Sequence, residues 1–136
     1  MARRRNPAHG PSQRQLRVGE AVRHALSRLF ERDVIKDPEL AGVSITVSEV
    51  TMSPDLKVAT VYVLPLGADE ARRGPILEAL NRVGPALRRM LGPMVALKFL
   101  PELRFAADTR FERAERIEAL LQEARAGSAG NGRDGA

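Results

Sequence analysis

Two runs of alternating apolar and polar residues, joined by a short turn, occupy residues 43–63. A period of two is typical of half-buried strands. In the turn, residues 53–56, proline presets φ for the second position and Asp55 suits the third. The pattern therefore predicts an antiparallel hairpin to which the helices on either side attach. The apolar positions of the first run are Val43, Ile45 and Val47.

A helix is predicted from Ser12 to about Arg32. Ser12 followed by Gln15 has the spacing of a capping box, which satisfies free amides of a first helical turn. Apolar residues then recur at helical spacing and define one buried stripe. The stripe consists of Val18, Val22, Ala25, Leu26, Leu29 and Phe30, and a largely basic side carries Arg14, Arg17, His24, Arg28 and Glu31.

A second long helix follows the hairpin. Residues 69–73 are expected to form a short turn, and Pro75 suits the first position of the helix proper. One apolar stripe then runs past Gly84-Pro85, where an interior proline removes a hydrogen bond to Asn81. We therefore expect one helix kinked at that pair. Its stripe is Ile76, Leu80, Val83, Leu87 and Met90.

A third strand is predicted at residues 95–100, where apolar residues again alternate, and Pro101 then indicates a bulge or an edge position. The same pattern assigns Phe30, Phe99 and Phe105 to the core. Thr109 and Glu112 form a second capping-box pair. That last helix, 109–125, is otherwise rich in Arg and Glu, so it either docks weakly or extends as a partner-binding arm.

The order of elements is α-β-β-α-β followed by a peripheral helix, which favours an α+β fold. A three-stranded sheet would have both core helices on one face. We divide the chain at the changes in composition. The expected parts are a disordered basic arm at 1–11, the domain at 12–108, the peripheral helix at 109–125 and a disordered tail at 126–136.

Charge favours an anionic macromolecule as partner. The net charge is +5, the pI is about 10.6, and only Lys36, Lys57 and Lys98 among the 22 basic residues are lysines. Arginine suits phosphate, although this composition could equally reflect the genome, with the charge aiding solubility. The chain shows no cysteine, signal peptide or membrane span, so we expect a cytoplasmic protein.

Catalytic chemistry is poorly supported. The two histidines are His9 in the arm and His24 on a helix surface, and no phosphate-binding loop is present. The carboxylates are scattered and suit turns, strand faces and caps. We expect no enzyme, no cofactor, no metal and no small-molecule substrate. With Phe111 and Tyr62 as the possible exceptions, the few aromatic residues suit a core rather than base stacking.

Four segments together resemble the bacterial ribosome-binding factor A family. They are RQLRVGEAVRHALSRLF, VSITVSEVTMSPDLKVATVYV, LNRVGPALRRMLG and VALKFLPELRFAAD, and the resemblance covers about residues 12–121. It implies a KH-like (type II) domain. It also implies a non-enzymatic factor that binds free 30S subunits and 16S rRNA late in assembly and is required for 16S rRNA 5′-end processing.

That family has an Ala-x-Gly kink between helical halves, whereas this chain has Val83-Gly84-Pro85. The glycine is displaced by one position and a proline is added, so the bend would have a different physical cause.

We hypothesise that basic residues of both core helices contact rRNA phosphates, with the protein acting as a monomer. The candidates are Arg14, Arg17, Arg82, Arg88, Arg89 and Lys98, together with Arg3, Arg4 and Arg5 of the arm. Each arginine could instead lie on a solvated face or pair with a glutamate. A protein-interaction module using the last helix or a sheet edge remains the alternative.

Overall fold

A computed structural model of the chain describes residues 10–134, and side chains from 10 to 127. Arg3, Arg4 and Arg5 lie outside the described residues. The helices are α1 (Gln13–Glu31), α2 (Glu70–Leu91) and α3 (Arg110–Asp134), and the strands are β1 (Ser44–Met52), β2 (Val58–Leu66) and β3 (Glu102–Ala107). Two short 3₁₀ turns, η2 (Pro38–Leu40) and η3 (Gly92–Met94), complete the described elements.

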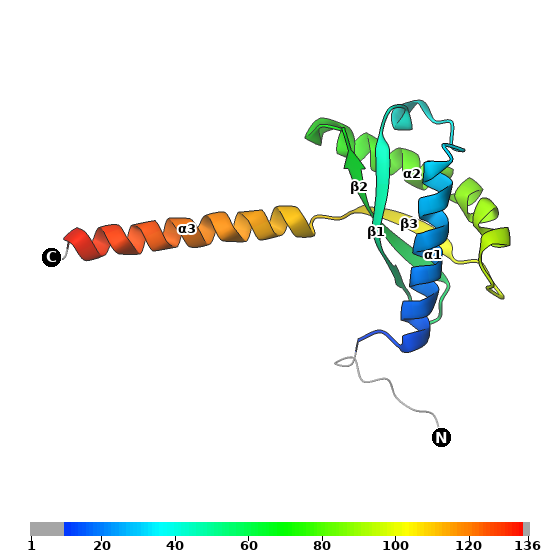
Figure 1. Ribbon diagram of the computed structural model, residues 1–136, viewed down its shortest axis with the longest axis horizontal. Coiled ribbons are helices and arrows are strands. Elements are labelled where there is room, and N and C mark those ends of the chain that lie inside the picture. Colours follow the sequence, from blue (N-terminus) through cyan, green and yellow to red (C-terminus); the bar gives the residue numbers. More distant parts are fainter. Residues whose placement is uncertain (1–9, 135–136) are drawn as a thin grey trace, which may run out of the picture.

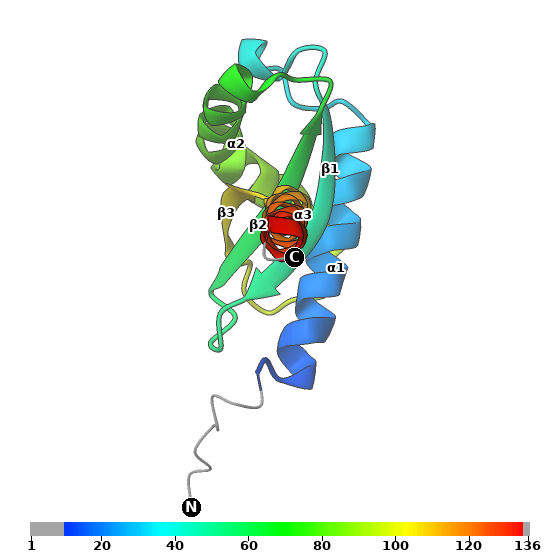
Figure 2. The same ribbon diagram turned by 90° about the vertical axis from the view of Figure 1, so that its left-hand side faces the viewer.

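The three strands form one mixed sheet in the order β1-β2-β3. β1 and β2 are the antiparallel hairpin, and β2 and β3 run parallel with α2 as their crossover. Figures 1 and 2 show α1 and α2 on one side of the sheet and α3 projecting from the other. The predicted α+β arrangement with both core helices on one face is confirmed.

The core lies between this sheet and its two covering helices. The α1 stripe predicted from spacing is largely buried, since Val22, Ala25, Leu26 and Leu29 are buried and Val18 and Phe30 pack against them. On α2 the stripe is shifted, because Leu91 is fully buried whereas Met90 is 36% exposed. The sheet contributes Val47, Val50, Met52, Ala59, Val61, Val63, Leu103 and Phe105.

Helix α1 is held against β1 by an amide and a glycine. The predicted capping box is present, with the Gln15 amide N–H donating to Ser12 Oγ and the Ser12 amide donating to Gln15 Oε1. The Gln15 Nε2 group also donates to the Met52 carbonyl at 2.9 Å. One turn later, a Cβ on Gly19 would lie 2.6 Å from the Val50 carbonyl oxygen. Only glycine therefore allows α1 this close to β1.

The prediction of a separate turn at 69–73 and a helix start at Pro75 was wrong. Asp69 caps α2 by accepting the Arg72 amide, so the helix begins at Glu70 and Pro75 lies within its second turn. The capping carboxylate stabilises the earlier start. Helix α2 remains α-helical through Gly84 and Pro85, as expected, and the kink at Val83-Gly84-Pro85 stays a prediction.

The predicted strand at 95–100 was also wrong. Residues 92–94 form η3, the following segment has no regular structure, and the strand begins only at Glu102. Arg88 of α2 binds the carbonyls of Leu100 and Pro101, which keeps this segment along the helix instead of in the ladder. Phe99, assigned to the core by alternation, is consequently 76% exposed.

Strand β1 contains a bulge that alternation along 43–63 did not include. The register shifts between Val47 and Glu49, leaving Ser48 as the extra residue. Ser48 Oγ contacts the Tyr62 carbonyl at 3.2 Å and Asp108 Oδ2 at 2.5 Å. Asp108 also accepts from the Arg110 amide and guanidinium. This cluster ties the bulge to the junction of β3 and α3.

Helix α3 continues to Asp134, beyond the end predicted at residue 125. A salt bridge between Arg73 and Glu112 joins its first turn to the start of α2. Its apolar residues Phe111, Ile117, Leu120 and Leu121 are exposed. Figure 1 shows most of α3 away from the body, so its stripe is not part of the core.

Replacing Gly19 with alanine should destabilise the fold. The new methyl group would meet a backbone carbonyl, and such overpacking typically costs about 1–3 kcal/mol, more than the roughly 1 kcal/mol gained in helix propensity. We expect the free energy of unfolding in urea to fall by about 1–2 kcal/mol. Gly127→Ala, with open space around its Cβ, is the matched control and should not lower it. Equal stability of the two variants would contradict the close packing.

The Asp108 cluster should make stability depend on pH. Hydrogen bonds from Arg110 and Ser48 hold the pKa of Asp108 well below its usual range. A lowered folded-state pKa adds stability above the unfolded value near 4, and this stability is lost as the pH falls below it. We expect Asp108→Asn to reduce the unfolding free energy by about 1–2 kcal/mol at pH 7, with the difference from wild type shrinking towards pH 3. A pH-independent difference would contradict this assignment.

Candidate nucleic-acid interface

A groove of about 440 Å³ lies between α2 and β3. α2 contacts β3 at this groove: a Cβ on Gly84 would lie 3.6 Å from the Leu103 carbonyl oxygen, an ordinary van der Waals distance. The predicted bend residues Gly84 and Pro85 therefore line a surface groove and also pack against β3. The full lining is Asn81, Gly84, Pro85, Arg88, Arg89, Glu102 and Leu103.

Asn81 fastens α2 to the outer edge of β3. Its Oδ1 accepts the Phe105 amide at 2.8 Å, and its Nδ2 donates to the Phe105 carbonyl at 3.2 Å. The side-chain amide thus makes the two hydrogen bonds that a fourth strand would make. Asn81 Nδ2 also donates to the Leu77 carbonyl one turn back. The side chain is thereby fixed between its own helix and the strand.

Two neighbouring arginines line this groove, and one of them, Arg88, stabilises the fold. Arg88 Nη2 donates to the Leu100 carbonyl at 2.7 Å, and its Nε donates to the Pro101 carbonyl at 3.1 Å. Arg89 is exposed and has no hydrogen-bond or ion-pair partner among the described side chains. Arg89 is therefore the cation that this groove offers to a ligand.

Arg82 is neutralised by an acid of the protein itself. Its guanidinium binds Asp37 through three contacts, the shortest 3.0 Å from Nη2 to Oδ2. Hydrogen bonds from the Glu39 amide and then from Arg82 lower the pKa of Asp37, so this pair stays charged. Arg82 joins α2 to η2 in this way, and its charge is balanced before any ligand arrives.

A second hollow, of about 300 Å³, collects cations from three separate segments. Arg14 comes from the first turn of α1, Lys57 from the end of the hairpin turn, and Lys98 from the irregular segment before β3. The remaining lining residues are Val18, Asp55, Leu56, Leu97 and Phe99. Arg17 lies exposed on α1 without an ion-pair partner in the described region and does not line either hollow.

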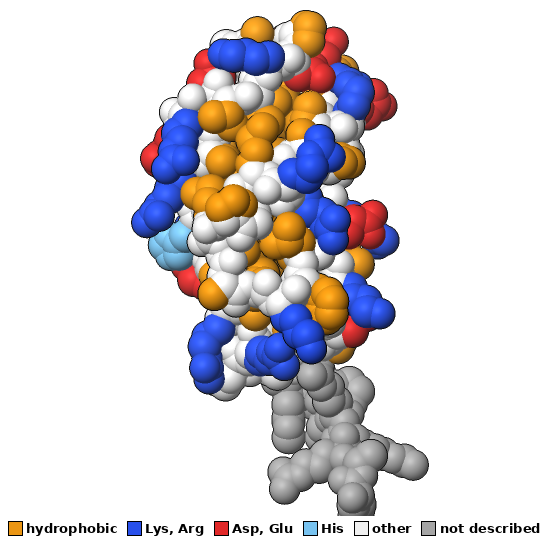
Figure 3. All heavy atoms as spheres, turned by 90° about the vertical axis from the view of Figure 1, so that its right-hand side faces the viewer, with side chains coloured by type: hydrophobic (Ala, Val, Ile, Leu, Met, Phe, Trp, Pro, Cys, Tyr) orange, Lys and Arg blue, Asp and Glu red, His pale blue; other side chains and the backbone are white. Residues whose placement is uncertain are grey.

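The face bearing α1 and the end of α2 is rich in positive charge. Figure 3 shows Lys and Arg side chains along its margins and across its lower end, some with Asp or Glu beside them, and hydrophobic side chains between the margins. On the open sheet face Arg104 pairs with Glu102, and Arg110 pairs with both Asp108 and Glu49. The helical side also holds ion pairs, Arg23 with Glu20 and Arg82 with Asp37. Its Arg14, Arg17 and Arg89, however, have no ion-pair partner among the described side chains.

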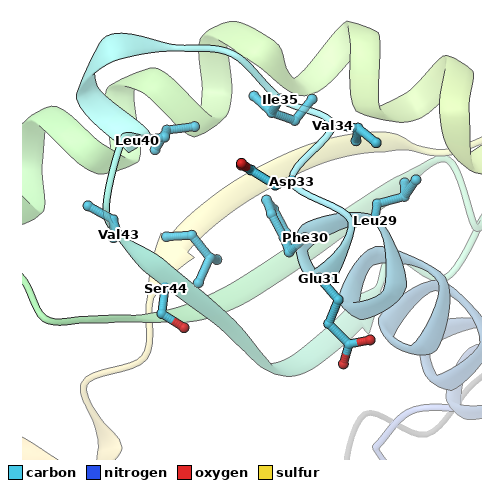
Figure 4. Close-up of a pocket in the computed structure, with 10 residues that line it drawn as sticks. Leu29, Phe30, Glu31, Asp33, Val34, Ile35, Leu40, Val43 and Ser44 are labelled. Atoms are coloured by element: carbon cyan, nitrogen blue, oxygen red, sulfur yellow. The ribbon is translucent and has the colours of Figure 1, made fainter.

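A third hollow at the C-terminal end of α1 has different chemistry. Figure 4 shows Phe30, Ile35, Leu40 and Val43 around it, with the carboxylates of Glu31 and Asp33 nearby. Its volume is about 120 Å³. Apolar walls with acidic residues and no basic residue do not suit a phosphate, so this hollow is not part of the candidate interface.

Sequence reasoning missed Asn81, Lys57 and Phe99. Asn81 is an exposed residue of α2, and its neighbours in the sequence do not indicate that it binds β3. Lys57 lies next to the predicted hairpin turn, and nothing in its neighbours indicates that it faces Arg14 and Lys98. Phe99 was misplaced because the run 95–100 alternates like a strand.

Within the described residues no cluster of three or more His, Cys, Asp or Glu side chains could hold a metal ion. The helices in the same part of the chain are too short or too polar to cross a membrane.

Comparisons with known proteins agree on one family. The family model described as ribosome-binding factor A matches residues 14–121. Ribosome-binding factor A of Phenylobacterium zucineum (strain HLK1) is 51% identical over 119 residues, covering 88% of this chain and 81% of the relative. The protein of the same name from Methylobacterium sp. (strain 4-46) is 55% identical over 114 residues, covering 83% and 80%.

A crystal structure and a fitted homology model have the same fold. The crystal structure of ribosome-binding factor A from Thermus thermophilus aligns with a TM-score of 0.55 and 28% identity, covering 68% of this chain and 93% of that one. A homology model of the Thermus thermophilus factor, fitted into a cryo-electron-microscopy map of its complex with the 30S subunit, aligns with a TM-score of 0.54 and 28% identity, covering 69% and 94%.

Removing the Asn81 side chain should loosen the groove. Asn81→Ala leaves the amide and carbonyl of Phe105 without these partners, and an unsatisfied buried polar group typically costs about 1–3 kcal/mol. We expect a loss of that size in unfolding free energy and faster amide hydrogen exchange at Phe105. Arg104→Ala, on the same strand but the open face, is the control. Unchanged exchange at Phe105 would contradict the bridging role of Asn81.

Proposed function

Because the chain belongs to the ribosome-binding factor A family, we propose that it binds the small ribosomal subunit through rRNA phosphates and assists late subunit assembly. The Thermus thermophilus member of this family forms a complex with the 30S subunit. We extend that association to this chain, with free 30S subunits and 16S rRNA as the partner.

The observation that carries the proposal is that the helical side keeps cations without an internal partner, although it also contains ion pairs such as Arg82 with Asp37. On the open sheet face Arg104 and Arg110 are bound by the protein's own carboxylates. On the helical side Arg14, Arg17 and Arg89 have no ion-pair partner among the described side chains. Cations without internal partners remain free to neutralise a polyanion.

Contacts to rRNA phosphates would supply the affinity, and the shape of the folded rRNA would determine where the protein binds. A-form RNA hides its base edges in a deep, narrow groove, so a rigid basic surface recognises its backbone geometry. Counterions released from neutralised phosphates make the affinity fall as salt rises, by about 0.7–0.9 in log K for each contact per unit of log salt. Arg82 and Arg88, which already have internal partners, are expected to contribute less than Arg14, Arg17 and Arg89.

We further propose that the protein acts without catalysis, cofactor or metal, as a monomer in the cytoplasm, and that it promotes processing of the 16S rRNA 5′ end. The scattered carboxylates serve the fold: Asp37 caps η2, Asp55 accepts hydrogen bonds in the hairpin turn, and Asp108 anchors the bulge. A protein that binds RNA without cleaving it would promote processing by holding the rRNA in a conformation in which it can be cleaved.

A second candidate function is favoured by α3. Its exposed apolar residues Ile117, Leu120 and Leu121, spaced along a helix that projects from the body, could contact another protein. A protein complex formed this way would resist salt and require no RNA.

Removing Arg14, Arg17 and Arg89 together tests the phosphate interface. We expect Arg14→Ala, Arg17→Ala and Arg89→Ala combined to weaken binding to purified small subunits. The salt dependence should also flatten, by about 0.7–0.9 in slope for each phosphate that is no longer neutralised. Co-sedimentation across a salt series measures both effects.

Arg104→Ala, which removes a paired cation from the open face, is the matched control and should bind as wild type. Arg82→Ala should have a smaller effect than Arg89→Ala. Wild-type co-sedimentation by the triple variant, with circular dichroism showing that it is folded, would overturn the assignment. Salt-resistant binding that disappears only on replacing Leu120 and Leu121 would favour the second candidate.

A further inference from the structure

An exposed aromatic ring lies beside the cationic hollow at the start of α1. Phe99 is 76% exposed on the irregular segment before β3, although its neighbours Leu97 and Leu100 are partly buried. Lys98 Nζ lies 5.5 Å from the centroid of the ring. Phe99 is not a core residue displaced by a flexible loop, because the segment is anchored on both sides of it.

The anchors make this ring a fixed feature. On its C-terminal side, Arg88 holds the Leu100 and Pro101 carbonyls. On its N-terminal side, Leu97 packs against the core. The ring therefore has a defined position next to the hollow instead of moving with a free loop.

Charge in the hollow favours an anionic ligand. Arg14, Lys57 and Lys98 contribute three positive charges from three segments. Asp55 is the acidic residue of the lining, and its Oδ1 already accepts hydrogen bonds from Ser53 Oγ and the Lys57 amide. The volume, about 300 Å³, is at the lower end of the range for small-ligand sites.

We propose that this hollow binds one unpaired nucleotide of RNA, with its base stacked on Phe99 and its phosphate held by Arg14, Lys57 and Lys98. An aromatic face with adjacent cations is the combination that single-stranded nucleic acids require, because every base has a stacking face and every nucleotide carries a phosphate. This inference rests on the proposed binding to rRNA. It adds a single-stranded contact to the backbone contacts made by Arg17 and Arg89.

The contact is separate from the groove between α2 and β3. The two hollows share no lining residue. Residues 92–101 connect them along the chain, so one RNA segment could follow this connection from a helical region at the groove to an unpaired nucleotide at Phe99. An acidic peptide is a poorer ligand for the hollow, because its carboxylates have no flat face that could stack on the Phe99 ring.

The tryptophan-free chain allows a direct test of stacking. Phe99→Trp introduces one fluorophore at the proposed contact. Titration with an unstructured RNA of about eight nucleotides should quench its fluorescence, because a stacked base contacts the indole face. Phe111→Trp places the same fluorophore at another exposed phenylalanine, on α3, and its fluorescence should not change. Equal responses at the two positions would overturn the proposal.

Phe99→Ala tests the energetic contribution. Loss of one stacked base should weaken binding of the single-stranded RNA by about 5- to 150-fold, without changing the salt slope, since no charge is removed. Arg14→Ala should weaken binding and also reduce the slope. Phe111→Ala is the control for removing an exposed ring.

Binding by Phe99→Ala within about twofold of wild type would contradict a nucleotide site. Quenching of the Phe99→Trp variant by an acidic peptide and not by RNA would contradict it as well.

The same samples separate this inference from the proposed function. If wild-type protein co-sediments with small subunits while Phe99→Ala behaves identically in every assay, only the nucleotide site is wrong. If wild-type protein fails to bind small subunits, the proposed function is wrong, whether or not the protein binds the short RNA.

Discussion

A three-stranded sheet has two open edges, and the structure depends on how both are closed. Unpaired backbone groups along an edge strand need partners, or they recruit other strands. At β1, Gln15 donates to the Met52 carbonyl and Gly19 lets α1 lie against the Val50 carbonyl. At β3, Asn81 binds both backbone groups of Phe105, and Gly84 faces the Leu103 carbonyl. At each edge a side-chain amide of a helix thus binds outward-facing backbone groups of the strand, and at β1 a glycine also permits the close approach of the helix.

This closure determines where the basic residues point. The buried apolar side of each helix, together with the amide that binds the strand edge, fixes how the helix is turned, so its outer side is fixed as well. Arg14 and Arg17 on α1 and Arg89 on α2 consequently face solvent on the helical side.

Internal contacts then decide which arginines remain available. Arg82 pairs with Asp37, and Arg88 holds the segment ahead of β3, so two of the arginines of α2 stabilise connections. Among the described cations without an internal ion-pair partner, Arg89 lines the groove, Arg14, Lys57 and Lys98 line the hollow, and Arg17 is exposed on α1. The ribosome-binding factor A fold here therefore keeps positive charge available on its helical side.

Local patterns determined much of the fold from the sequence alone. The alternation around a proline-aspartate turn specified the hairpin, the Ser12 and Gln15 pair specified the start of α1, and helical spacing specified which side of α1 is buried. These signals act between residues close in the chain. Even the bulge at Ser48 had a local sign, because two polar residues separate Val47 from Val50.

Tertiary structure decided the features that depend on distant segments. Alternation at 95–100 indicates a strand, but Arg88 binds the backbone there and β3 forms further along, which leaves Phe99 exposed. Arg82 and Arg89 are alike in the sequence, but only Arg82 has an ion-pair partner among the residues that the structure describes. The reason is that Asp37, distant along the chain, lies beside Arg82 and not beside Arg89. Residue type sets what a side chain can bind, whereas the packing of segments far apart in sequence determines which partner it finds.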